Sequence, residues 1–65
     1  MDKQRIKIEK SGEGKWIVRY KENVIPGMIL GGNGIFSVQV GGKQLSQHRS
    51  KIKASYALVA QFEKI

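Results

Sequence analysis

The fold of this chain is decided by residues 15–21, Lys-Trp-Ile-Val-Arg-Tyr-Lys, in which every second side chain is large and apolar. An apolar period of two is typical of a β-strand with one buried face. Trp16, Val18 and Tyr20 would then point into the core. Residues 4–10 alternate in the same way, and a short glycine-containing turn joins the two stretches. We therefore predict a β-hairpin at the start of the chain.

Two more strands are predicted downstream of this hairpin. Residues 35–40 alternate again, and a Gly-Gly turn leads to residues 43–46, which we predict as a short edge strand. The Pro26-Gly27 pair suits a type II turn, so the apolar segment 24–30 is expected to fold back on itself as a minor hairpin. Residues 31–34, Gly-Gly-Asn-Gly, are expected to form a mobile loop tip.

A helix is predicted at the end of the chain. The period changes at Ser50, whose hydroxyl can accept from the free amides of a first helical turn. Apolar side chains then recur at spacings of four, three and three, which places them on one helix face. We predict a helix over residues 51–63, with a core-facing stripe of Ile52, Tyr56, Val59 and Phe62.

Together these elements predict an α+β fold, in which a three- or four-stranded antiparallel sheet packs on one C-terminal helix. The length allows a single small domain, residues 1–65. The helix stripe should cover the apolar face of the sheet, with Trp16 against Tyr56 or Phe62. The residues predicted to point inward from the sheet are Ile6, Ile8, Trp16, Val18, Tyr20, Phe36, Val38 and Val40.

The composition favours a polyanionic partner and excludes several protein classes. Lys and Arg number 12 and Asp and Glu number 5, so the net charge is +7. The chain has no cysteine and a single histidine, His48, which excludes a thiolate or structural zinc site. No apolar run approaches the ~20 residues of a membrane span. Residues 1–10 are charged rather than signal-like, so we expect a cytoplasmic protein without membrane association.

Catalytic motifs are not found in the sequence. The acidic residues are dispersed, His48 lies in a polar stretch, and no phosphate-binding glycine loop occurs. We therefore expect no enzymatic activity, no catalytic residue, no cofactor and no bound metal.

The outward side of the predicted sheet carries the functional hypothesis. No second helix is available to cover it, and its charged residues are basic except for Glu9. Arg19 lies in the centre of a strand, where its two-pronged guanidinium suits phosphate and guanine. Ile17 could contact a thymine methyl group, and Gln39 could bond to adenine. The residues of this sheet face predicted to bind nucleic acid are Arg5, Lys7, Lys15, Ile17, Arg19, Lys21 and Gln39.

A second basic cluster is predicted around the start of the helix. The free amides of a helix N-terminus attract phosphate, and flanking cations add to that attraction. Trp16 and Tyr20 are assigned to the core, which favours binding of a duplex over a single strand, because single-strand binding uses exposed aromatic rings. The residues of this second cluster are Lys43, Arg49, Lys51 and Lys53.

Residues 14–20, Gly-Lys-Trp-Ile-Val-Arg-Tyr, resemble the G-x-W-x-V-R strand of the small N-terminal arm-site-binding domains of phage and transposon tyrosine integrases. Relatives of that family include plant ethylene-response-type DNA-binding domains. Residues 50–54, Ser-Lys-Ile-Lys-Ala, are similar to the T-K-x-x-A start of the family's C-terminal helix. The resemblance implies a three-stranded sheet, backed by one helix, that reads the DNA major groove. It places Lys15, Ile17 and Arg19 on the DNA-facing strand, and it implies binding without cleavage.

We therefore hypothesise non-catalytic binding of nucleic acid, with duplex DNA favoured, by an accessory or regulatory protein of a phage or mobile element. The alternative is a small protein-interaction module or inhibitor that binds an acidic partner protein. A homodimer built on the apolar segment 24–30 would agree with this alternative. The location of that segment discriminates between the two, because exposed apolar residues would mark a protein interface.

Overall fold

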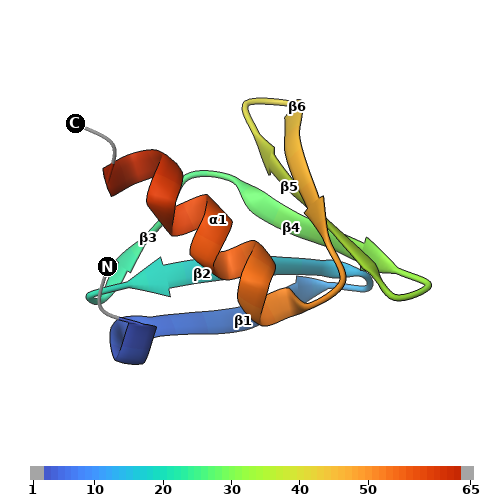
Figure 1. Cartoon of the computed structure of the whole chain (residues 1–65). Coiled ribbons are helices and arrows are strands. Elements are labelled where there is room, and N and C mark those ends of the chain that lie inside the picture. Colours follow the sequence, from blue (N-terminus) through green and yellow to red (C-terminus); the bar gives the residue numbers. More distant parts are fainter. Residues whose placement is uncertain (1–2, 64–65) are drawn as a thin grey trace.

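Six strands and one helix follow one another in the computed structural model, which describes residues 3–63 (Figure 1). The strands form one antiparallel sheet in the spatial order β1-β2-β4-β5-β6, while β3 pairs with β2 beside this path. The elements are a 3₁₀ turn (Lys3–Arg5), β1 (Ile6–Gly12), β2 (Lys15–Tyr20), β3 (Asn23–Val24), β4 (Met28–Gly32), β5 (Ile35–Val40), β6 (Lys43–His48) and α1 (Lys51–Glu63).

The fold class is α+β as predicted, but the sheet has more strands than the three or four expected from the sequence. The difference lies in the segment 24–30, which does not form a separate minor hairpin. Instead β3 and β4 both pair with the same edge of β2, β3 beside its C-terminal half and β4 beside its N-terminal half. The amide of Ile25, between the two strands, donates to the carbonyl of Val18 at 2.8 Å. Strand β4 is thereby inserted between β2 and β5.

Two glycines make this insertion possible. Gly27 has φ 114°, and a Cβ there would lie 2.6 Å from the backbone oxygen of Gln39, so the kink between β3 and β4 requires glycine. Gly31 lies within β4 and not in a loop tip. The Phe36 and Trp16 rings pack so closely on it that a Cβ there would lie 2.5 and 2.7 Å from them, so this position requires glycine. Only residues 33–34 of the predicted mobile loop form the turn.

The remaining elements lie close to their predicted positions. Strands β2 and β5 lie where the alternation indicates, and β6 extends two residues beyond the predicted edge strand. Strand β1 is shifted by two residues, because residues 3–5 form a 3₁₀ turn and Ser11 and Gly12 continue the strand. The helix has the predicted bounds. Its N-terminus is capped by the Ser50 hydroxyl, which accepts from the amides of Ile52 and Lys53 at 3.2 and 3.5 Å.

The core lies between α1 and one face of the sheet, and the predicted inward parity of the strands is confirmed. Val18, Ile29 and Val38 are fully buried from three neighbouring strands. The partly buried residues packed around the core include Ile6 and Trp16. The buried apolar residues are Val18, Tyr20, Ile25, Ile29, Val38, Ala54, Leu58 and Val59.

The predicted helix stripe is only half right. Val59 is buried as expected, but Ile52 and Phe62 are 56% and 39% exposed. The helix instead buries Ala54 and Ser55, whose small side chains let its backbone approach the sheet. Leu58 is the other buried helix residue. The Ser55 hydroxyl donates to the Ile52 carbonyl at 2.6 Å, so its burial leaves no unpaired polar group.

Trp16 lies on the inner face, packed against the core as predicted. Its ring meets Phe36 edge-to-face, with centroids 5.6 Å apart and planes at 66°. The contact expected with Tyr56 or Phe62 stays a prediction. The Lys51 ammonium lies 5.0 Å from the centroid of the Trp16 ring. The side chain is half-buried at the end of the core next to the helix N-terminus.

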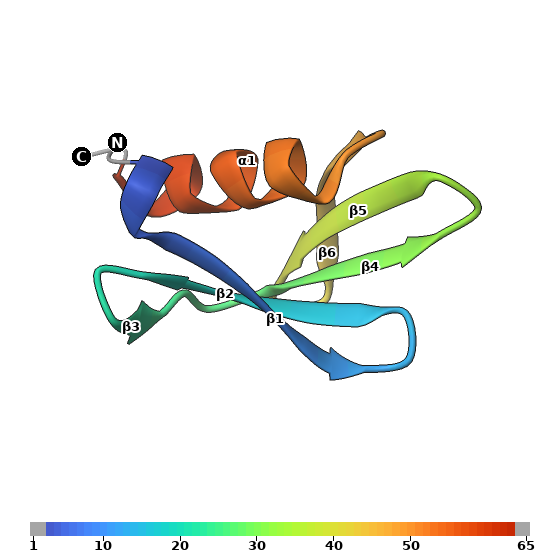
Figure 2. The ribbon, with the colours of Figure 1, turned by 90° about the horizontal axis from the view of Figure 1, so that it is seen from below.

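The helix covers one face of the sheet, and no other element of residues 3–63 covers the opposite face (Figure 2). The sheet is strongly twisted, so β5 and β6 cross the direction of β1 and β2 (Figure 1). In the described part of the chain, no helix has the length and apolarity needed to span a membrane.

Candidate nucleic-acid interface

The candidate interface lies on the outer face, which we define as the side of the sheet turned away from α1. The pairing of β1 with β2 sets Lys7 directly opposite Arg19, and Glu9 directly opposite Ile17. Since Val18 between them is buried on the inner face, these four side chains share the outer one. The register therefore gives Lys7 and Arg19 the predicted outward placement, whereas Arg5 lies in the 3₁₀ turn before β1 and Lys21 in the turn after β2.

A shallow concavity of about 490 Å³ opens where β1 begins and β2 ends. The amide of Lys21 donates to the carbonyl of Arg5 at 3.2 Å, which holds these two cationic residues together at the end of the hairpin. Four of the seven lining residues are cationic and two are acidic. We call this site the basic concavity, and its lining residues are Gln4, Arg5, Lys7, Glu9, Arg19, Lys21 and Glu22.

The turn that follows β2 is an unusual part of the concavity wall. Lys21 and Glu22 have φ values of 52° and 70°, and they connect the paired residues Tyr20 and Asn23. Two residues of positive φ in a two-residue hairpin loop form a type I′ turn, for which Asn-Gly is the favoured sequence. The Asn23 side-chain amide supports the turn by donating to the Lys21 carbonyl at 3.2 Å. Because the turn contains no glycine, the sequence gives no signal for it.

Arg19 and Glu9 form an ion pair inside the concavity. The Arg19 Nε donates to Glu9 Oε1 at 2.5 Å. The two side chains are 41% and 48% exposed, so solvent and salt screen the pair, which contributes only about 0–1 kcal/mol to stability. The pair orients the guanidinium, and little free energy is needed to break it.

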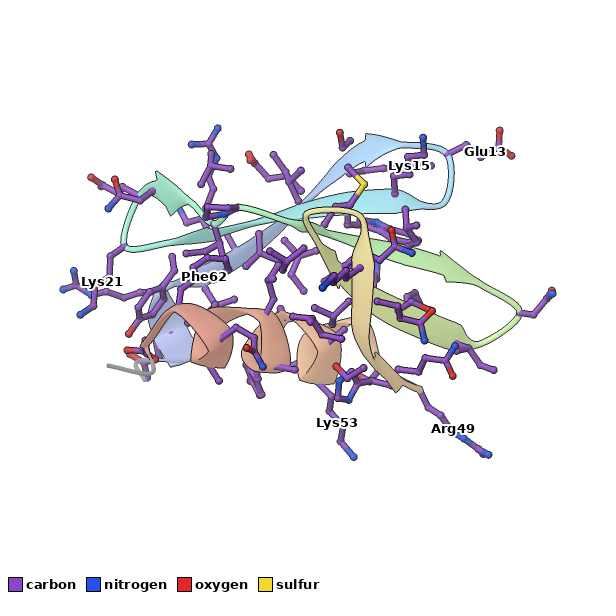
Figure 3. All side chains as sticks on the ribbon, turned by 90° about the horizontal axis from the view of Figure 1, so that it is seen from above. Glu13, Lys15, Lys21, Arg49, Lys53 and Phe62 are labelled. Atoms are coloured by element: carbon purple, nitrogen blue, oxygen red, sulfur yellow. The ribbon has the colours of Figure 1, made fainter. Side chains whose placement is uncertain are left out.

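The structure does not bring all the predicted cations together. Lys15 lies on the outer face, opposite Leu30, but at the far end of β2 from Lys21, roughly 20 Å along the chain direction. Figure 3 shows Lys15 and Lys21 at opposite ends of the molecule. Lys15 therefore does not line the concavity.

The predicted second cluster is not continuous with the outer face. Arg49 and Lys53 point away from Lys15 on the helix side of the molecule (Figure 3). Lys51 stacks on the Trp16 ring, and Lys43 begins β6 opposite Val40.

An apolar strip, which sequence reasoning missed in part, runs beside the basic concavity. Strand β4 contributes Met28 and Leu30, which share the outer face because Ile29 between them is fully buried. Both are half-buried, as is Ile17 on β2. Val24, opposite Arg19, is 49% exposed. Only Ile17 was predicted to lie on this face, because the segment 24–30 was expected to pair with itself.

The chemistry of the outer face is that of a polyanion-binding surface with apolar and amide neighbours. Gln39 lies opposite Met28 on β5, so it borders the apolar strip. The aromatic residues of the strands, Trp16, Tyr20 and Phe36, all belong to the inner face. Among residues 3–63, no three His, Asp or Glu side chains gather closely enough to hold a metal ion.

Comparison of the chain with protein-family models, with curated proteins and with solved structures finds no match. The features of this chain that bear on its function are therefore the basic concavity, the apolar strip and the strand register that positions them.

Proposed function

We propose that this protein binds duplex nucleic acid, with duplex DNA favoured, through the basic concavity and the adjoining outer face of β1 and β2, and that it does so without catalysis. The observation that carries the proposal is that four cationic residues, two of them arginines, line one concave site. Arginine and lysine side chains gathered in this way are suited to neutralise neighbouring phosphates. The net charge of +7 adds long-range attraction to a polyanion.

A duplex suits this surface better than a single strand. The strand aromatics are used in the core, so within residues 3–63 the outer face has no ring on which an unpaired base could stack. The five-strand path is roughly 19 Å wide, whereas the major groove is about 12 Å wide and admits a two-stranded ribbon. We therefore assign the groove contact to the β1–β2 hairpin, with Arg19 and Ile17 nearest the bases.

The resemblance to integrase arm-site-binding domains belongs to the same proposal. Its matched residues Lys15, Ile17 and Arg19 share the outer face of β2. On this basis we propose that the protein is an accessory or regulatory factor of a phage or mobile element. The sheet differs from the three strands that the resemblance implies, because β4 and β6 extend it.

Titration of a labelled duplex at several salt concentrations tests the proposal. Each phosphate neutralised lowers the slope of log affinity against log salt by about 0.9, so four contacts give about −3.6. Lys7→Gln should weaken all sequences alike and flatten the slope by about one. Arg19→Ala should cost about 1–3 kcal/mol and relax preference at one base position.

Lys53→Gln is the matched control, since it removes the same charge from the helix side. An equal effect of Lys53→Gln and Lys7→Gln would show diffuse charge attraction. A lack of binding to any duplex at low salt would rule out the proposal, and tighter binding to a single strand would rule out the duplex assignment.

A second candidate function, binding of an acidic partner protein, is supported by the apolar strip. An apolar centre with a charged rim is the usual composition of a protein interface. Met28 and Leu30 fit such a centre, and Lys15 and Arg19 fit the rim. Leu30→Gln would distinguish the two, because it should leave the salt slope for duplex binding unchanged while abolishing association with a protein partner or with a second copy of this chain.

A further inference from the structure

We propose that Glu9 is an internal competitor for the anion that the basic concavity binds. Its carboxylate holds Arg19 in the free protein, and a phosphate of the duplex displaces it on binding. This inference rests on the proposed function, and it identifies the residue that sets the affinity of the site and its selectivity for closely spaced phosphates.

The register explains why the carboxylate lies where it does. Arg19 and Lys7 are directly opposite each other on β2 and β1, and like charges in that position repel. Glu9 is the next outer-face residue of β1, diagonal to Arg19, and its Oε1 accepts from the Arg19 Nε. Its carboxylate therefore occupies one of the positions at Arg19, that of the Nε–H donor, where a phosphate oxygen could accept.

The pair is easily exchanged. Both side chains are more than two-fifths exposed, so water and salt compete with the contact. Two phosphate oxygens can accept from the guanidinium as a carboxylate does, and a duplex also presents further phosphates to Arg5, Lys7 and Lys21 at the same time. A ligand with one isolated anionic group lacks that second attraction. Glu9 thus disfavours isolated anions more than it disfavours a nucleic-acid backbone.

The displaced carboxylate remains within the concavity and acts against the bound phosphate. Removal of its charge should therefore strengthen binding, although it also removes an ion pair from the free protein. This opposite effect on binding and on folding separates a competitor from a residue that merely supports the fold.

The experiment compares Glu9→Gln with Glu13→Gln, which makes the same change in net charge at an exposed residue of the β1–β2 turn, outside the concavity lining. Affinity for one duplex is measured at several salt concentrations, and circular dichroism confirms that both variants fold. We expect Glu9→Gln to bind roughly three- to ten-fold more tightly than the unaltered chain at low salt. Its salt slope should steepen by up to about one, because the Glu9 carboxylate then no longer neutralises Arg19 in competition with phosphate. Glu13→Gln should have a clearly smaller effect on both.

The Arg19 Nε–H resonance supplies a second readout. We expect duplex binding to the unaltered chain to move this resonance away from its Glu9-bonded position. Equal affinities of Glu9→Gln and Glu13→Gln, or an Arg19–Glu9 contact that persists in the complex, would overturn the inference alone. Weaker binding of Glu9→Gln at cytosine-containing sites would overturn it in favour of a direct base contact. Failure of both the unaltered chain and Glu9→Gln to bind duplex would instead remove the proposed function.

Discussion

The two faces of the sheet are built from the same strands, yet they meet different demands. On the inner face, Val18, Ile29 and Val38 have no exposed surface, and α1 closes over them. On the outer face, Ile17 and Leu30, each next in sequence to one of these residues, stay partly open and lie among cations. The inner residues therefore carry the stability of the domain, while the outer ones are available to a partner.

Because of this difference, substitution of two neighbouring residues should lower the free energy of unfolding by very different amounts. A domain of 65 residues has a net stability of only a few kcal/mol, so the loss of one core side chain is a large fraction of it. The same loss on the outer face leaves no cavity, because no layer covers that face within residues 3–63. Paired substitutions at adjacent positions of one strand therefore test whether the two faces differ in this way.

The largest difference is expected between Ile29→Ala and Leu30→Ala on β4. The two side chains have the same number of carbon atoms, but Ile29 is fully buried and Leu30 lies in the apolar strip. We expect Ile29→Ala to cost about 2–5 kcal/mol, which approaches or exceeds the total stability. Leu30→Ala should cost about 1 kcal/mol or less. Urea denaturation followed by circular dichroism measures both, and equal costs would show that a second layer of protein covers the outer face.

The next difference is expected two residues further along β4, between Gly31→Ala and Gly32→Ala. A Cβ at Gly31 would collide with the Phe36 and Trp16 rings, whereas a Cβ at Gly32 has nothing within 4 Å. We expect Gly31→Ala to cost about 1–3 kcal/mol by overpacking. Gly32→Ala should be neutral or slightly stabilising, because it reduces the freedom of the unfolded chain. If Gly31→Ala left the free energy of unfolding unchanged, the Phe36 and Trp16 rings would have to move apart, and the inner face would be less tightly packed than in this structure.

The third effect concerns the outer face alone and should run in the opposite direction. Replacement of Lys21-Glu22 by Asn-Gly gives the positive-φ turn its preferred residues, so we expect the free energy of unfolding to rise by about 1 kcal/mol. It also removes one cation and one acid from the basic concavity. Because the two lost charges act on a bound phosphate in opposite directions, affinity for duplex should change little while the melting temperature rises. A several-fold loss of affinity would show that Lys21 contributes more to binding than Glu22 opposes it.

Features of the fold that depend on a single segment could be predicted from the sequence, and features that depend on contacts between distant segments could not. The alternation of residues 15–21 and the Ser50 cap are properties of single segments, so the inner parity of β2 and the bounds of α1 were predicted correctly. The placement of β4 is not local. A Gly-Gly pair weakens a strand by itself, and only the rings of Trp16 and Phe36, from two other strands, give Gly31 its place in the sheet.

The same distinction between local and long-range features applies to the candidate site. Strand parity predicted the outward positions of Lys7 and Arg19. Parity cannot tell how far apart two residues of one face lie, and Lys15 was therefore grouped with cations that the structure places at the other end of β2. Glu22 was missed because a positive-φ turn without glycine has no sequence signal. The apolar strip was missed because it depends on the insertion of β4.

The smallest effect is expected at Ile52, and it tests the same division between covered and open faces on the helix. The spacing of apolar residues assigns Ile52 to the buried stripe, and burial of that kind would make Ile52→Ala cost about 2–5 kcal/mol. In the structure the side chain is 56% exposed, and the helix buries the smaller Ala54 instead. Alanine also has the higher helix propensity. We therefore expect Ile52→Ala to change the free energy of unfolding by less than about 0.5 kcal/mol, whereas Leu58→Ala, its matched control with no exposed surface, should cost several times more.

A large loss at Ile52, measured by thermal and urea denaturation, would mean that α1 is rotated about its axis relative to this structure. Ala54 and Ser55 would then leave the sheet, and the inner face would be sealed by the stripe that the sequence predicts.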